Sequence, residues 1–205
     1  MNYLLLSQSF YPTMSLLFSN KSLIYSVIQY PNEQYPNNLI FLTKTMFDIL
    51  KIDKKDLGGI FVIYGPGSFT GTRISVVDAK ILAYSLSVPL YPVNSLELTA
   101  AHVSGKVSAI LSASKNEFFV EDFEDGKKIS DVEIFNLEKI VNSDKIFVSF
   151  EKLENFKSYK QVFPDVEVIR KFCLNLVLKK QFIEDPLSLK PLYLRAEEKL
   201  FKKIR

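Results

Sequence analysis

The chain of 205 residues contains one cysteine, one histidine and seven glycines. A single thiol, Cys173, excludes an internal disulfide and fits a reducing compartment. The thiol lies in the apolar run "KFCLNLVL", and its sole imidazole partner would be His102. We therefore interpret Cys173 as a small core residue rather than a nucleophile.

A strong charge of either sign is also missing, since the net charge at pH 7 is +3. This excess alone does not indicate nucleic-acid binding, which needs a basic cluster on one face. The C-terminal "EEKLFKKIR" comes nearest, and we interpret it as a solvated helix end rather than an RNA contact. The first residues, "MNYLLLSQSF", have no basic leader and too short an apolar stretch for a signal peptide or a membrane span. We expect a cytoplasmic protein with no membrane contact.

The apolar residues, 47% of the chain, are arranged in runs typical of a soluble globular protein. In the first hundred residues these runs predict strand, strand, strand, helix, strand, helix, strand, helix. A shorter version of the pattern starts after His102. We therefore predict a duplicated α/β architecture with mixed sheets flanked by helices. The domains would be 1–102 and a smaller 103–205, whose C-terminal helix is able to pack back on the first.

Local signals place the turns and helices of this pattern. Residues 20 and 21 suit a hairpin turn, and a second strand pair turns at 114–116. Ser95 is expected to cap a helix. The predicted helices cover residues 39–51, 72–86, 95–103 and 168–180.

A glycine-rich turn, "VIYGPGSFTGTRIS" at 62–75, joins a strand to a helix. It lacks the lysine of a Walker A loop, and Gly71 comes one residue too late for a dinucleotide fingerprint. The glycines on either side of Pro66 are free to adopt positive φ. Ser68 or Thr70 can cap the following helix. Helix N-termini attract anions, but we favour a structural turn over a nucleotide site.

The helix after this turn is apolar on two sides. The face that we expect on the sheet contains Ile74, Val77, Ile81 and Tyr84. The opposite face contains Val76, Ala79, Ala83 and Leu86. Its two alanines would allow a second helix to approach closely. Either another chain covers this face and the outward Phe41 of the preceding helix, or the second domain or the C-terminal helix covers both.

The motif "GPGSFTGTRI" at 65–74 closely resembles the hallmark of the TsaB (YeaZ) family, G-x-G-P-G-S-F-T-G-[LTV]-R-[IL]. Ile63 stands in place of its first glycine. Near the end, "PLYLR" at 191–195 resembles the family's P-x-Y-[LV]-R signature. The order of the surrounding elements also fits, so the resemblance covers nearly the whole chain. It implies the actin, sugar-kinase and Hsp70 (ASKHA) fold of two similar α/β domains.

The resemblance also implies a role in bacterial tRNA modification. Family members help to form N6-threonylcarbamoyladenosine at position 37 of tRNAs that read codons beginning with A. The implied transferase is the metal-bearing paralogue TsaD, which this chain would bind and activate as a heterodimer, together with the ATPase TsaE. Alone, the chain is expected to form a homodimer, and tRNA is reached through the complex. No cofactor is expected on this chain alone, and ATP or ADP would belong at the complex interface.

From the motif and the two-faced helix we predict one partner interface. Its expected members are Phe41, Gly65, Gly67, Ser68, Phe69, Thr70, Gly71, Arg73, Val76, Ala79, Ala83 and Leu86.

Departures from the family's pattern argue against catalysis by this chain. Ser7 and Ser112 stand where members usually carry aspartates. With His102 alone, the chain cannot place two metal-binding histidines on one helix face, as TsaD-type enzymes do. Acids such as Asp78 and Glu97 are interpreted as solvated or capping residues, because nothing pairs them. We expect a scaffold subunit without catalytic or metal-binding residues. The alternative is an independent nucleotide-dependent ASKHA-type enzyme.

Overall fold

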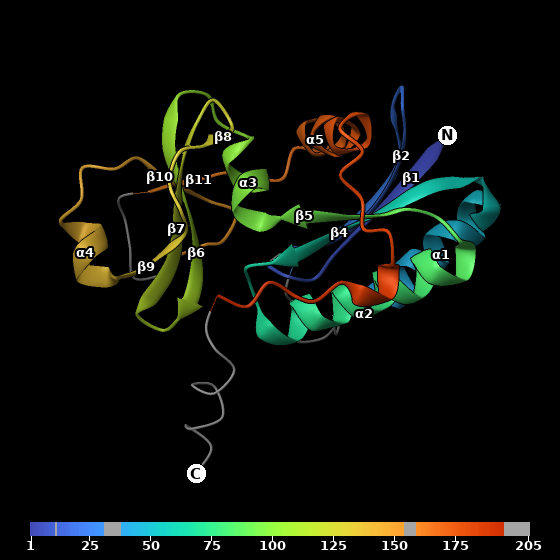
Figure 1. Cartoon of the computed structure of the whole chain (residues 1–205), viewed down its shortest axis with the longest axis horizontal. Coiled ribbons are helices and arrows are strands. Elements are labelled where there is room, and N and C mark those ends of the chain that lie inside the picture. Colours follow the sequence, from blue (N-terminus) through green and yellow to red (C-terminus); the bar gives the residue numbers. More distant parts are fainter. Residues whose placement is uncertain (11, 31–37, 154–158, 195–205) are drawn as a thin grey trace, which may run out of the picture.

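Two mixed β-sheets form the frame of the protein, and helix α3 lies between them (Figure 1). The computed structural model describes residues 1–10, 12–30, 38–153 and 159–194. The basic tail at 195–205 lies outside this part of the chain. The described elements are β1 (Asn2–Ser7), β2 (Thr13–Ser19), β3 (Leu23–Gln29), α1 (Leu39–Leu50), η1 (Lys54–Asp56), β4 (Leu57–Gly65), α2 (Phe69–Leu86), β5 (Leu90–Asn94), α3 (Ser95–Ala100), β6 (Lys106–Ser114), β7 (Glu117–Glu124), β8 (Lys127–Lys128), β9 (Glu133–Asn136), α4 (Leu137–Val141), β10 (Phe147–Ser149), β11 (Tyr159–Gln161), α5 (Val166–Leu178) and η2 (Pro186–Ser188).

The two sheets repeat one pairing scheme. The first has the order β3-β2-β1-β4-β5, and β1 pairs antiparallel with β2 and parallel with β4. The second has the order β11-β10-β6-β7-β8, with β9 also on β7, and β6 pairs antiparallel with β7 and parallel with β10. A central strand with a hairpin partner on one side and parallel strands on the other therefore occurs twice. This confirms the duplicated actin-like α/β fold, while the domain boundary after residue 102 stays a prediction.

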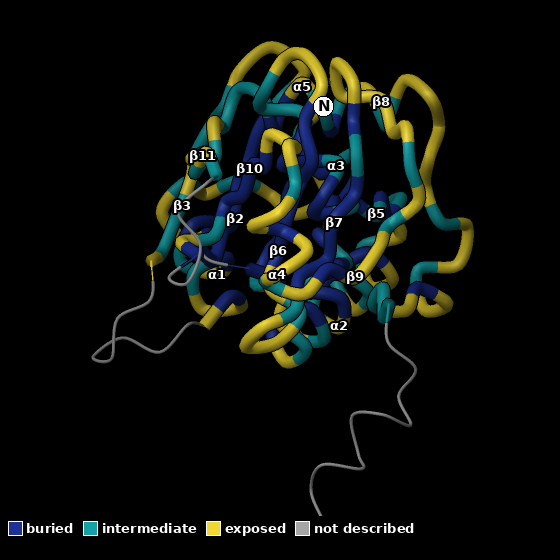
Figure 2. Tube along the Cα trace, turned by 90° about the vertical axis from the view of Figure 1, so that its left-hand side faces the viewer, coloured by how far each residue is buried: buried dark blue, intermediate teal, exposed yellow. Residues whose placement is uncertain are grey.

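The first sheet is covered on both faces. Leu4 and Leu6 of β1 pack with α1 and α2, whereas Leu5 packs with α5. Because successive side chains of a strand point to opposite faces, β1 has to be apolar at nearly every position. Cys173 on α5 is fully buried in this core, as predicted, and burial raises the pKa of its thiol. Figure 2 shows buried strands at the centre and an exposed outer layer.

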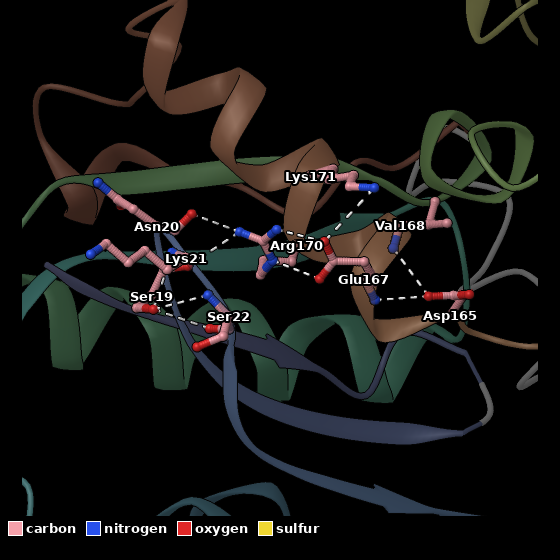
Figure 3. Close-up of polar contacts among 9 residues, drawn as sticks. All are labelled: Ser19, Asn20, Lys21, Ser22, Asp165, Glu167, Val168, Arg170 and Lys171. Atoms are coloured by element: carbon pink, nitrogen blue, oxygen red, sulfur yellow. Dashed lines mark hydrogen bonds and ion pairs between the residues drawn. The ribbon is translucent and has the colours of Figure 1, made fainter.

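Helix α5 follows the second sheet in the chain but packs on the first, and Arg170 fastens it there. The guanidinium donates to the carbonyl oxygens of Asn20 at 2.8 Å and Ser19 at 3.5 Å (Figure 3). The same side chain forms a bidentate pair with Glu167 on its own helix. Arg170 is 8% exposed, because its side chain lies between α5 and the turn after β2.

The start of α3 differs from the sequence prediction. Asn94, not Ser95, is the N-cap, and its side chain accepts from the amides of Leu96 at 2.8 Å and Glu97 at 3.3 Å. Both amides lie within reach of an N-cap side chain. The hydroxyl of Ser95 instead donates to the carbonyl of Pro66. It therefore ties α3 to the glycine-rich turn.

Candidate functional site

The glycine-rich turn between β4 and α2, residues 65–71, is a close-packed elbow. Gly65 has a φ of 117°, in the region that favours glycine. A Cβ on Gly67 or Gly71 would collide with the backbone of Ser9 or Gln8, which lie after β1. These glycines therefore let the helix start lie directly on the end of β1.

The polar groups of the elbow form hydrogen bonds with other groups of the same chain. The amide of Ser68 donates to the carbonyl of Ser9 at 2.6 Å. Its hydroxyl caps α2, as predicted, and accepts from the amide of Gly71 at 3.3 Å. The hydroxyl of Ser75, one turn further on, accepts from the amide of Gln8 at 2.6 Å. The amides of Ser68 and Gly71 thus already have acceptors within the chain.

The two sequence motifs meet at this elbow. The amide of Leu192 donates to the carbonyl of Tyr64 at 2.8 Å. The Nε of Arg73 donates to the hydroxyl of Tyr193 at 2.6 Å, and its guanidinium carbon lies 3.8 Å from the centre of the Phe69 ring. Phe69 and Arg73, both predicted to contact a partner, contact the chain's own C-terminal segment. Arg195, the last residue of the second motif, lies outside the described residues.

Helix α2 turns the opposite way from the sequence prediction. Val76, Ala79 and Ala83 are at most 1% exposed and pack in the core with β1 and β4. Leu86 is half-buried against the same core. For Val76, Ala79 and Ala83, the prediction that they face a partner is wrong. The small alanines let the helix approach the chain's own sheet.

The exposed face of α2 is the one that we expected on the sheet. Its large apolar side chains are 38% exposed for Ile74, 51% for Val77, 58% for Ile81 and 63% for Tyr84. We call these four residues the α2 surface. Their spacing of three, four and three residues puts them on one side of the helix. Phe41 of α1 is 61% exposed, which confirms that it points outward.

A groove of about 650 Å³ continues this face at the C-terminal end of α2. It begins at Tyr84 and passes Val88 and Pro89 to Phe182 and Pro186. Phe182 is 41% exposed. The groove thus continues from the end of the α2 surface onto residues 182–186, and Ser85, Ser87 and Glu184 also line it.

Ser7 and Ser112 stand where the family's pattern has aspartates, and neither supplies a carboxyl group. The amide of Ser112 donates to Glu151 at 2.8 Å, and burial raises the pKa of this glutamate. Ser7 is fully buried, and its hydroxyl has no partner among the described residues. Between the elbow and Ser112 lies a cavity of about 160 Å³.

His102 has a structural role. Its Nδ1 lies 2.8 Å from the carbonyl of Leu98, which assigns the proton to that nitrogen. Its Nε2 accepts from the amide of Asp165, the N-cap of α5, at 3.1 Å. Burial lowers the pKa of the imidazole. The ring therefore joins α3 to the start of α5 in its neutral form.

Asp78 on α2 is not the solvated residue that its pattern suggests. Its Oδ2 atom is buried and has no hydrogen-bond partner in the described structure. Burial raises the pKa of this carboxyl from 3.8 to about 6. Apart from the general excess of apolar residues around it, nothing in the sequence signals this.

In the described part of the chain, no helix is long and apolar enough to cross a membrane. The same residues include no group of three or more histidine, cysteine or acidic side chains placed to hold a metal ion.

Residues 31–162 match the family described as "TsaD: tRNA N6-adenosine threonylcarbamoyltransferase". Over 122 residues the chain is 32% identical to the tRNA threonylcarbamoyladenosine biosynthesis protein TsaB of Bacillus subtilis, covering 58% of this chain and 53% of that protein. The match thus spans about half the length of that relative. A TsaB of Buchnera aphidicola from Acyrthosiphon pisum is 22% identical over 87% of this chain and 91% of its own.

The fold is also found among solved structures. YeaZ from Pseudomonas aeruginosa superposes with a TM-score of 0.76 at 18% identity, covering 94% of this chain and 99% of that one. At this identity the likeness shows the fold.

Proposed function

The chain belongs to the TsaB (YeaZ) family, and we propose that it is the partner subunit of the complex that forms N6-threonylcarbamoyladenosine in tRNA. The observation that carries this proposal is the α2 surface. Four large apolar side chains stand in solvent along about 15 Å of helix. A contiguous apolar area on a soluble domain marks an interaction site.

The occupant that we propose is a TsaD-family transferase, which this chain would bind and activate. Such a partner covers the α2 surface, the outward Phe41 and the groove beyond Tyr84. The remaining members of the assembly are proposals too. They are the ATPase TsaE, a homodimer when the transferase is absent, and tRNA bound through the complex in the cytoplasm.

We propose that the transfer itself takes place on the partner. The single imidazole supports this, because both ring nitrogens of His102 are engaged with Leu98 and Asp165. A general base needs a nitrogen that can reach the proton it removes. Moreover, Ser7 and Ser112 supply no carboxylate to the region between the sheets.

The alternative, an independent nucleotide-dependent enzyme, is less well supported. Ligand pockets typically measure roughly 300–1,000 Å³, whereas the cavity between the elbow and Ser112 measures about 160 Å³. The amides of Ser68 and Gly71 already have acceptors within the chain. We propose that any ATP or ADP binds at the interface with the partner.

Reconstitution tests the function directly. Purified TsaD-family transferase, TsaE, tRNA and the threonylcarbamoyl donor are incubated with and without this chain, and the modified nucleoside is quantified. We expect modification to depend on the chain. An equal rate in its absence would refute the partner-subunit function.

One variant then tests the surface. Ile81→Glu puts a charge at the centre of the α2 surface and should weaken binding of the transferase by more than about tenfold. Val141→Glu is the matched control, because Val141 is 64% exposed and lies on α4, away from α2 (Figure 1). If both variants bind like wild type, the partner docks elsewhere.

A further inference from the structure

A cavity of about 580 Å³ lies where α3, the turn between β7 and β8, and α5 meet (Figure 1). Small-molecule sites typically measure roughly 300–1,000 Å³. Helix α5 packs on the face of the first sheet that carries Leu5, whereas α2 packs on the face that carries Leu4 and Leu6. The α5 wall of the cavity is therefore on the other side of the sheet from the α2 surface.

Each wall of the cavity is fixed by contacts within the chain. The hydroxyl of Ser95 ties α3 to the carbonyl of Pro66. The amide of Gly105 donates to Oδ1 of Asp125 at 2.8 Å and fixes the turn between β7 and β8. Arg170 holds α5 on the first sheet. The fold therefore forms this cavity without a ligand.

The α5 wall combines an apolar base with polar groups. Its four lining residues are spaced by three, one and three positions, which puts them on one side of the helix; they are Phe172, Asn175, Leu176 and Lys179. Phe172 and Leu176, together with Val103, pack against the buried core and leave an apolar base. Asn175 and Lys179 are exposed beside it. One amide and one cation thus stand next to an apolar surface.

Glu97 supplies a carboxylate from α3. It is half-buried in the lining of the cavity, and no hydrogen bond or ion pair with the described residues engages its oxygens. Unlike Oε2 of Glu121, these oxygens are not buried against the chain. Burial and the Glu121 carboxylate raise the pKa of Glu97 against the opposing charges of Lys128 and Lys179. The carboxylate is therefore accessible and lies within electrostatic reach of both β8 and α5.

The cations of β8 and α5 differ in their engagement. The Nζ of Lys128 lies 2.7 Å from Oε1 of Glu121 and 3.5 Å from Oδ1 of Asp131. The ammonium group of Lys179 forms no ion pair or hydrogen bond within the described parts of the chain. Glu97 and Lys179 thus offer opposite charges to the cavity from two different helices, without an ion pair between them.

We propose that this cavity binds a small zwitterion of the amino-acid type, with its ammonium group on Glu97, its carboxylate on Lys179 and its apolar part on Phe172. Both polar contacts are charge-assisted hydrogen bonds. The other two charges at the rim, Lys127 and Asp125, are of opposite sign, so a ligand without net charge matches the lining. This site is independent of the proposed function, and the free chain is sufficient to test it.

Two isomers serve as probes, namely leucine and 6-aminohexanoate, which carry the same two charges at different separations. Hexanoate and hexylamine each lack one of these charges. Calorimetry with the free chain should show saturable binding of at least one isomer, at least about tenfold tighter than that of either single-charge probe. At ten times its dissociation constant, that isomer should raise the melting temperature by roughly 3–6 °C. No saturable binding of either isomer up to about 20 mM, or equal affinity for a single-charge probe, overturns the proposal.

Two variants place the bound isomer in the cavity. Glu97→Gln and Lys179→Gln should each weaken its binding by roughly 10- to 100-fold, because each leaves one charge of the ligand unpaired. The matched controls are Glu138→Gln, which removes an exposed carboxylate on α4, and Lys171→Gln, which removes an exposed cation on α5 outside the cavity. Both controls should bind the isomer like wild type. Wild-type affinity of Glu97→Gln or Lys179→Gln, or an equal loss in the controls, would show that the zwitterion does not bind as proposed.

Discussion

Arg170→Ala tests how α5 is held to the first sheet. The substitution removes the donor that binds the Asn20 carbonyl at 2.8 Å and the Ser19 carbonyl at 3.5 Å (Figure 3). Because Arg170 is 8% exposed, its removal also leaves a gap between the helix and the turn after β2. We therefore expect a loss of stability rather than a local surface effect.

The magnitude follows from the contacts. A hydrogen bond from a charged donor contributes about 1.5–3 kcal/mol, and the bond to Asn20 is of this kind. The contact at 3.5 Å adds little, since it is at the limit of hydrogen-bond length. Glu167 is 46% exposed and becomes hydrated when its partner is lost, so it also adds little. We expect a loss of about 2 kcal/mol, or roughly 4–8 °C in melting temperature for a protein of this size.

The neighbouring residue provides the control. Lys171 lies 3.8 Å from the same carboxylate of Glu167, but its side chain is 70% exposed. Lys171→Ala should change stability by less than about 0.5 kcal/mol. Urea and thermal unfolding of both variants measure the difference. Equal shifts for Arg170→Ala and Lys171→Ala would show that the link to the turn contributes nothing.

Two further predictions concern the elbow and the histidine. Gly71→Ala should lower the melting temperature by roughly 5–10 °C, because its methyl group meets the rigid backbone of Gln8. Gly58→Ala, whose methyl group meets only the flexible Met1 side chain, should change it far less. For His102, burial holds the pKa below the ordinary 6.5, so its contribution to stability is present above pH 6.5 and is lost as pH falls through the lowered value. Urea unfolding at pH 7.5 and 5.5 should therefore show a smaller loss on acidification for His102→Phe than for wild type, and an unchanged loss would contradict this role.

Much of the fold is predictable from local sequence. The continuous apolar run of β4 and the hairpin turn at residues 20 and 21 appear where the pattern predicts them. Both signals depend on residues close together in the chain, namely a buried strand and a tight turn. The sequence predicts Ser95 as the cap of α3, one residue after the actual cap, Asn94. Both side chains suit an N-cap, and only the position of Pro66 assigns Ser95 to another bond.

The orientation of α2 in the candidate site is not predictable from local sequence. The elbow motif alone indicates the family and the start of α2. The spacing of apolar residues indicates that α2 has two apolar sides. A helix with apolar residues on two opposite sides gives no preference for which side lies inside. The side with Ala79 and Ala83 packs on the sheet, because these small residues permit a close approach that Ile81 and Tyr84 do not. The same packing buried one oxygen of Asp78. The exposed apolar face of α2 and the buried oxygen of Asp78 are thus products of tertiary structure, since they depend on what lies against the helix and not on the helix alone.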